Sequence, residues 1–306
     1  MRSERGQGTV ELVGLLGVVA LVMVGLLAAG AAVPGGALAR ELVGRMLCAA
    51  VLADGCGDEP VLIATYGDEV GRLVRRHMPT IAFEEGSRAL PVDWRRCRLT
   101  ECGDGPQEGL VHRSDQRLPV TAFVHVVDCR AAAREASEAA GVDCSGRRAG
   151  RLYLQYWLYY ANSTTGQIPV VGPLDEHRDD WESVQLRIGS DGRVDERASS
   201  HHGYNYERSF ANGGSDAGID FVREASEDVG LREVGGWGPE TGLLEVSGGS
   251  HAGNVGSGER GTRFVPGRRV HLVPLEPIAA HSHSTFAVVP PWLKQVWRDP
   301  EASGTD

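Results

Sequence analysis

The N-terminal region carries the longest apolar stretch of the chain. Residues 10–33 are nearly all Leu, Val, Ala, Gly and Met, and residues 12–39 hold no charged side chain. At about 1.5 Å per residue, a helix over residues 10–33 is long enough to cross the hydrocarbon core of a bilayer. Arg2 and Arg5 precede it, and this charge bias favours a cytoplasmic N-terminus. The pattern predicts a single-pass cell-membrane anchor that places the C-terminal part outside the cytoplasm.

Beyond the anchor, helical periodicity is confined to three short stretches, over residues 38–53, 60–76 and 130–140. Other segments are rich in β-branched and aromatic residues and are bounded by Gly, Pro, Asn or Asp, which is typical of strands. These segments are residues 118–127, 152–160, 181–188, 242–246 and 270–275. We therefore expect a mainly β fold, an antiparallel β-sandwich with a few helices, preceded by one N-terminal transmembrane helix.

The same pattern predicts three segments. Residues 1–39 form the leader and membrane helix, residues 40–117 a helical or irregular lead-in that contains disulfides, and residues 118–306 the β-sandwich domain. Two polar, glycine-rich loops at residues 203–218 and 249–261 are expected either to be mobile or to face a ligand.

Composition excludes several classes of protein. The 306 residues are 42% hydrophobic and 24% charged, which excludes a disordered or fibrous chain. The net charge is −10 and no run of basic residues occurs, which argues against nucleic acid and against electrostatic docking on anionic lipid. Lys294 is the single lysine, so chemistry that needs a lysine nucleophile has almost no candidate.

All six cysteines follow the predicted membrane span. An even number in this position indicates disulfides in an oxidising compartment. Fifteen connectivities are compatible with six cysteines, and sequence order favours three short loops. These would be Cys48–Cys56, Cys97–Cys102 and Cys129–Cys144.

Residues 5–12 (RGQGTVEL) place Glu11 one position inside the apolar run, where an ionised carboxylate is unfavourable. Cleavage after Gly6 would make Glu11 the fifth residue of the mature chain. This stretch resembles the class III leader of type IV prepilins, most closely the TadE-like pseudopilins of tight-adherence systems. The resemblance implies a prepilin peptidase and pilus components as partners, whereas the alternative is a plain anchor with an interfacial glutamate.

A second informative stretch is residues 177–188 (HRDDWESVQLRI). Asp180 and Glu182 alternate in register with Val, Leu and Ile, so both carboxylates point to the buried side of a strand. Two inward carboxylates repel each other and lose hydration, so they require a cation, shared protons or nearby donors. A divalent cation, Mg²⁺ or Ca²⁺, with His177 as the imidazole ligand is the simplest solution. In the alternative, Arg178 or another arginine neutralises a purely structural cluster.

Two further histidine motifs end candidate strands in glycine-rich turns, SSHHGY at residues 199–204 and GGSHAG at residues 248–253. Each alone is more often structural, but a histidine beside glycine is easily placed near a ligand. Together with the acidic motif they predict one ligand-binding site, formed by His201, His202, Ser250 and His251.

The ordered series LQYWLYY, HxxDWE, SHHG and GSHA, within residues 77–297, resembles the vacuolar-sorting-associated protein 62 family and, more distantly, the necrosis-inducing toxins. The toxin resemblance implies a β-sandwich with a divalent cation in a solvent-facing pocket. The matching ligands are His177, Asp180 and Glu182. Asn162 stands where that family has an aspartate, Asp179 replaces a histidine, and His202 matches a His-Gly motif.

Three functions remain open from the sequence. The first is a membrane-anchored extracytoplasmic β-sandwich with a divalent-metal pocket that binds an external glycan or lipid headgroup. The second is a metal-dependent hydrolase with His202 or His251 as the base, although Ser250 lacks the strand-turn-helix context of a nucleophilic serine. The third is a minor pseudopilin of a tight-adherence pilus. Whether the protein is an enzyme is left open.

Overall fold

The computed structural model describes residues 58–85, 90–95, 120–163, 166–168, 172–174, 177–200, 203–205, 236–255, 264–266, 270–279 and 285–303. The predicted leader, the predicted membrane span and the predicted helix over residues 38–53 lie outside these ranges. Within them, no helix is both long and apolar enough to cross a bilayer. The chain divides into two compact units, residues 1–75 and 76–306, and each is described by itself.

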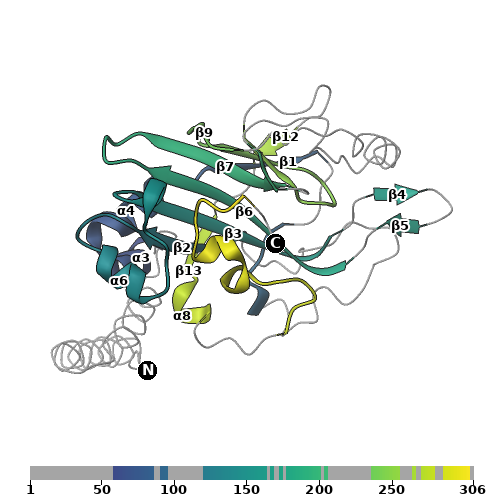
Figure 1. The fold of residues 1–306 in the computed structure, drawn as a ribbon. Coiled ribbons are helices and arrows are strands. Elements are labelled where there is room, and N and C mark those ends of the chain that lie inside the picture. The colour runs from purple at the N-terminus through teal and green to yellow at the C-terminus, as the bar shows by residue number, and fades with distance from the viewer. Residues whose placement is uncertain are drawn as a thin grey trace, which may run out of the picture. The chain divides into compact units, whose positions relative to one another are not determined.

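The described part of the first unit is a pair of helices, α3 (Glu59–Tyr66) and α4 (Asp68–Arg76) (Figure 1). The sequence predicted one helix here, and Gly67 divides it because its φ of 83° leaves the helical region. The amide of Gly67 ends α3 by donating to the carbonyl of Ile63 at 2.9 Å. A Cβ on Gly71 would lie 2.7 Å from the Ile63 nitrogen, so the two helices pack backbone to backbone.

The second unit contains a seven-stranded sheet with the order β13-β2-β3-β6-β7-β8, and β9 pairs with β7 beside this path. Neighbouring strands are antiparallel except β13 and β2, which run parallel. The strands are β2 (Thr121–Asp128), β3 (Leu152–Ser163), β6 (His177–Ile188), β7 (Val194–Ser200), β8 (Gly203–Asn205), β9 (Gly238–Pro239) and β13 (His271–Pro274).

A smaller sheet has the order β11-β10-β1-β12, and its central pair, β1 and β10, is parallel. Its strands are β1 (Thr80–Glu84), β10 (Leu243–Val246), β11 (Gly253–Val255) and β12 (Phe264–Pro266), and β4 (Gly166–Ile168) pairs with β5 (Gly172–Leu174) apart from both sheets. The protein is therefore mainly β, but the expected purely antiparallel arrangement is wrong because both sheets are mixed. Parallel pairs need long connections, and β1 and β10 are separated by most of the described chain.

Short helical segments complete the second unit. They are α6 (Arg134–Ala139), η2 (Gly146–Arg148), α8 (Glu276–Ala279), η3 (Pro291–Leu293) and η4 (Gln295–Trp297). Helix α6 is shorter than the predicted helix over residues 130–140. The predicted Cys129–Cys144 disulfide is present and closes the segment that carries α6. The other four cysteines lie outside the described residues.

The two sheets meet where β11 lies against β7. A Cβ on Gly253 would lie 3.1 Å from the Cβ of Ala198 and equally close to the carbonyl of Ser199. Ala198 pairs in register with Val184 of β6. The face of the larger sheet that carries the even-numbered residues of β6 therefore turns toward the smaller sheet.

The opposite face of the larger sheet holds an aromatic cluster. Trp181 projects there from β6, 5% exposed, with its ring centroid 5.2 Å from that of Trp94 and 5.9 Å from that of Phe123. Residues 285–303, which we call the C-terminal strap, cover this face through Phe286 and Trp292. The burial of Trp181 opposite Asp180 and Glu182 follows from the strand alternation.

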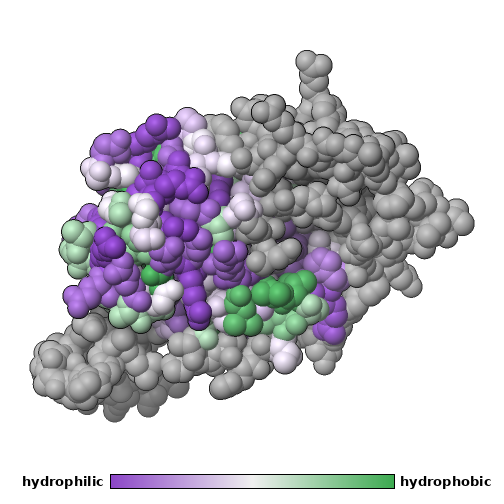
Figure 2. All heavy atoms as spheres, in the orientation of Figure 1, coloured by the Kyte–Doolittle hydropathy of each residue, from purple (hydrophilic) through white to green (hydrophobic). Residues whose placement is uncertain are grey.

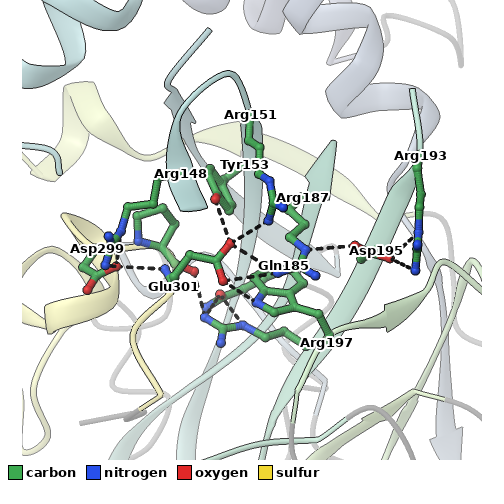
Figure 3. Close-up of polar contacts among 12 residues, drawn as sticks. Arg148, Arg151, Tyr153, Gln185, Arg187, Arg193, Asp195, Arg197, Asp299 and Glu301 are labelled. Carbon is green, nitrogen blue, oxygen red and sulfur yellow. Dashed lines mark hydrogen bonds and ion pairs between the residues drawn. The ribbon is translucent and has the colours of Figure 1, made fainter. Parts of the chain in front are cut away.

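One buried carboxylate ties the C-terminal strap to the sheet (Figure 3). Glu301 accepts hydrogen bonds from the Tyr153 hydroxyl at 2.8 Å and the Trp237 indole at 3.1 Å. Arg151 and Arg187 pair with it at 3.2 Å each. Beside it, Arg197 lies between the rings of Tyr204 and Trp237 and donates to the carbonyl of Pro300. Burial lowers the pKa of Arg197 to about 10, so this guanidinium remains charged at neutral pH.

Candidate functional site

The candidate site begins with a pair of carboxylates at the start of β6. Asp180 is 8% exposed and Glu182 is partly exposed, and the alternation of β6 places both on the face toward the smaller sheet. In the neighbouring strand β3, Tyr160 lies directly opposite Asp180. Like charges at this spacing repel, so the surroundings of the pair determine its chemistry.

The turn between β10 and β11 places an imidazole on the first carboxylate. His251 is fully buried, and its Nδ1 lies 2.8 Å from Oδ2 of Asp180. Because an ionised carboxylate only accepts, Nδ1 donates in this contact, and Nε2 has no hydrogen-bond partner among the described residues. The imidazole stacks on the ring of Tyr160, with centroids 3.8 Å apart and planes within 3°. A φ of 58° at His251 is unusual for a residue other than glycine.

The second carboxylate is held differently. Oε2 of Glu182 accepts a hydrogen bond from the Ser199 hydroxyl of β7 at 2.5 Å. Burial of the carboxyl group, followed by the charge of Asp180, raises the pKa of Glu182 well above its ordinary value, and the Ser199 hydrogen bond and Lys294 oppose this only partly. Neither carboxylate forms an ion pair with an arginine or lysine in the described part of the chain. Among the described residues, no arginine therefore neutralises the pair.

Several polar atoms of this region are buried without a hydrogen-bond partner. Among the described residues they include Nε2 of His251, the hydroxyl oxygen of Tyr160 and Oγ of Ser250. An unpartnered buried polar group costs roughly 1–3 kcal/mol. Burial and the charges of Asp180 and Glu182 also raise the pKa of Tyr160, so its hydroxyl stays protonated and can donate. A bound cation, ligand or ordered water would relieve this cost.

The residues expected from the sequence divide into three groups. Asp180, Glu182 and His251 come together, and Asn162 is buried on the same face of β3, two positions beyond Tyr160. His177 lies exposed at the start of β6, with Nδ1 3.0 Å from the carbonyl of Asp179. It pairs in register with Ser163, whose hydroxyl donates to the carbonyl of Gly249 in the turn that carries His251. His201 and His202 lie outside the described residues.

The side chains of this face offer oxygen donors to a divalent cation. Asp180, Glu182 and Asn162 offer the oxygen donors that Mg²⁺ and Ca²⁺ prefer. The described residues contain no group of three or more His, Cys, Asp or Glu that converges on one point as a metal site. The oxygen donors of the pair are of the kind that a hard cation prefers, and the imidazole in contact with the pair is that of His251.

Tyr160 and Ser199 contribute to the site but were not predicted from the sequence. Tyr160 belongs to the even-numbered residues of β3, with Leu158 and Tyr156, and these pair with the even-numbered residues of β6. The alternation along β3 was therefore the available signal that Tyr160 lies on the same face as the carboxylates. Ser199 reaches Glu182 only because β7 pairs with β6, and no local pattern shows that register.

The described fold is a mainly β protein with two mixed sheets and few helices. No protein-family model and no curated protein sequence matches the chain. Three solved structures show similarity. Necrosis and ethylene inducing protein 2, from the causal agent of cocoa's witches' broom disease, is 15% identical with a TM-score of 0.35, over 68% of this chain and 75% of that one.

NLPPya, solved in complex with mannosamine, is 14% identical with a TM-score of 0.36, over 74% of this chain and 86% of that one. A structure described as a toxin fold for microbial attack and plant defense is 17% identical with a TM-score of 0.30, over 67% and 74% of the two chains. These are toxin-type proteins, which the sequence motifs also resemble distantly. Similarity at this level carries no conclusion about the function of this chain, and the resemblances to the vacuolar-sorting-associated family and to the TadE-like leaders stay predictions.

Proposed function

We propose that this protein is a membrane-anchored, extracytoplasmic β-sandwich that binds an external glycan or lipid headgroup at a pocket containing a divalent cation. The observation that carries the proposal is the carboxylate pair of Asp180 and Glu182. Both lie on the inner face of β6, where Asp180 contacts the imidazole of His251 and Glu182 accepts a hydrogen bond from the Ser199 hydroxyl. A divalent cation, Mg²⁺ or Ca²⁺, supplies the missing positive charge.

The alternative to a cation is a proton on Glu182. Burial of the Glu182 carboxyl group, followed by the charge of Asp180, raises its pKa and so favours this proton. A cation competes with that proton, so binding releases it and the affinity rises with pH. Proton release on addition of cation would therefore distinguish a cation pocket from a purely structural acid pair.

Two features support the extracytoplasmic location. The disulfide between Cys129 and Cys144 requires an oxidising compartment in most organisms. The apolar stretch over residues 10–33 supplies an anchor that leaves the β unit outside the cytoplasm.

The test is isothermal titration of the full chain with Mg²⁺ and Ca²⁺, together with elemental analysis of the protein as purified. We expect close to one equivalent of metal, and an affinity at least roughly tenfold lower in Asp180→Asn. Asp191→Asn is the matched control because Asp191 lies in an exposed turn and an amide oxygen can still accept from the Arg193 amide. Equal metal binding by wild type and Asp180→Asn would refute the pocket.

A second candidate function, a metal-dependent hydrolase, is favoured by one observation. Asp180 orients His251 through Nδ1 and leaves Nε2 unpartnered, which is the arrangement of a general base. In this case the cation would activate water and His251 would accept its proton. Turnover of phosphoester or carboxylester substrates that is lost in His251→Gln, while metal binding persists, would identify the hydrolase.

A further inference from the structure

An apolar patch stands on the C-terminal strap at residues 288–293. Val289 is 47% exposed and Leu293 is 71% exposed, and these are the large apolar side chains that stand out as exposed in the described part of the chain. Figure 2 shows a green surface at the place where Figure 1 draws the yellow strap. Apolar patches with polar surroundings mark interaction surfaces on folded proteins.

The patch is held in place by its own segment. Pro290 and Pro291 restrict the backbone, and the amide of Leu293 donates to the carbonyl of Pro290 at 3.0 Å. Beneath the two exposed side chains, the Trp292 ring packs 5.6 Å from Phe286 and 5.9 Å from Trp94. The exposure of Val289 and Leu293 is therefore a property of the folded state and does not depend on a loose loop.

We propose that this patch inserts into the headgroup–acyl boundary of the bilayer that anchors the chain. The inference rests on the anchor in the proposed function. Residues 34–57 separate the predicted membrane span from the first described residue, and at about 3.4 Å per residue they reach at most on the order of 80 Å. A tether of this length keeps the chain at a high effective concentration near that membrane.

The chemistry of the patch fits a zwitterionic lipid surface. Valine, leucine and a partly buried tryptophan are typical of segments that lie in the membrane interface. The net charge of −10 disfavours anionic lipid. A second copy of the chain is the poorer occupant, because a stable dimer buries about 800 Å² on each partner and this patch offers two exposed aliphatic side chains.

The segment that carries the patch is also tied to the larger sheet. The carboxylate of Asp179 accepts from the amide of Ala287 in the strap at 2.8 Å, and Asp180 follows it in β6. The strap that carries the patch is therefore fixed to the strand that also carries Asp180 and Glu182, although these two carboxylates lie on the opposite face of the sheet.

The test uses the full chain in phosphatidylcholine nanodiscs, with acyl chains that are either brominated or unmodified. Bromine quenches tryptophan within the bilayer, so we expect lower emission in brominated discs for wild type. This difference should be lost in Val289→Glu/Leu293→Glu and reduced in Trp292→Phe. Ala139→Glu/Ser190→Glu adds two charges at exposed positions elsewhere and should keep the difference.

The outcomes separate the inference from the proposed function. Absence of quenching in wild type, or equal quenching in the glutamate variant, overturns the insertion. Absence of quenching together with fewer copies per disc in that variant would assign the patch to a second copy, which also overturns it. Mg²⁺ or Ca²⁺ binding in the same discs tests the pocket separately, and failure of the chain to enter discs overturns the anchor and the tether argument with it.

Discussion

At the residue scale, two left-handed residues flank Asp180. Asp179 has a φ of 59° and His251 a φ of 58°, and they are the two residues other than glycine with positive φ in the described part of the chain. One precedes Asp180 in β6, and the other binds its carboxylate. Such backbone conformations cost of order 1–3 kcal/mol and persist where the surrounding structure fixes them. Their position is a physical reason to treat Asp180 as functional.

Asp179 is held by two hydrogen bonds, from the Tyr159 hydroxyl at 2.6 Å and from the Ala287 amide at 2.8 Å. Asp179→Ala removes both and leaves a side chain that disfavours positive φ, so we expect a loss of about 2–4 kcal/mol of unfolding free energy. Asp179→Asn tolerates the backbone and keeps an acceptor, so it should lose clearly less. Urea denaturation measures both, and equal losses would contradict the role of the backbone.

The raised pKa of Glu182 predicts that the unfolding free energy depends on pH. Its pKa in the folded state lies above the ordinary value of 4.5, so the folded protein keeps a proton that the unfolded chain has released. Without cation, the unfolding free energy should therefore fall as pH rises above about 4.5 toward the pKa of the folded carboxyl group. Glu182→Gln removes this dependence and should flatten the profile.

Urea denaturation in the presence of chelator, between about pH 4 and 8, checks this profile. Glu135→Gln, on the exposed surface of α6, is the control and should follow wild type. A wild-type profile parallel to that of Glu182→Gln would show that Glu182 titrates normally.

At the element scale, polar contacts of Glu301 fix the C-terminal strap to the larger sheet. Apolar side chains fill the space between the strap and the sheet. Glu301 is surrounded by Arg151, Arg187, Tyr153 and Trp237, so all its lone pairs are engaged. A buried pair of this kind adds little net stability over apolar residues, but its disruption leaves uncompensated charge. The strap should therefore be sensitive to a single neutral substitution.

We expect Glu301→Gln to lower the unfolding free energy by about 3–5 kcal/mol, because Arg151 and Arg187 lose their shared carboxylate. Glu138→Gln is the matched control. It removes an exposed pair with Arg134, in which both side chains are about half exposed, and should cost less than about 0.5 kcal/mol. Similar losses in chemical denaturation would mean that Glu301 does not anchor the strap.

Strands with strong local patterns were predictable from the sequence, whereas strands defined by their partners were not. β3 and β6 were predicted from runs of aromatic and alternating residues, although each proved longer. β7 (VDERASS) reads as polar, yet Glu196 is buried because Thr241 donates to it through both its amide and its hydroxyl. The three-residue strands β11 and β12 are too short for any periodicity.

The candidate site divides in the same way. Alternation along β6 predicted the inward pair of Asp180 and Glu182, and the GSHA motif predicted His251. Which side chain contacts which carboxylate could not be predicted. His251 reaches Asp180 only because the turn that joins β10 and β11 belongs to the other sheet and packs against β6. His177 was grouped with the acids by sequence distance, and in the structure it lies exposed at the start of β6, where it pairs in register with Ser163.

At the scale of the whole molecule, an apolar N-terminal segment and a disulfide-stabilised β unit belong to one chain of net charge −10. In the proposed function the first is the membrane anchor and the second binds the ligand. Cleavage of the predicted leader can therefore be tested independently of the pocket.

If residues 5–12 act as a prepilin leader, N-terminal sequencing of the membrane-bound protein should begin at Gln7, so that Glu11 becomes the fifth residue. Gly6→Val should block the cleavage and leave the full chain. A wild-type protein that begins at Met1 in a host with a prepilin peptidase would reject the leader and leave a plain anchor.

The pairing of β1 with β10 has a consequence for the order in which the protein folds. Thr80 aligns with Leu243, so the central strand of the smaller sheet must wait for a partner made more than a hundred residues later. Contacts this distant in sequence slow folding. Under the proposed extracytoplasmic location, Ile81 and Phe83, which are buried in the folded protein, stay uncovered until β10 has also been exported. On that proposal the smaller sheet, and with it the contact of His251 with Asp180, forms only after β10 has crossed the membrane.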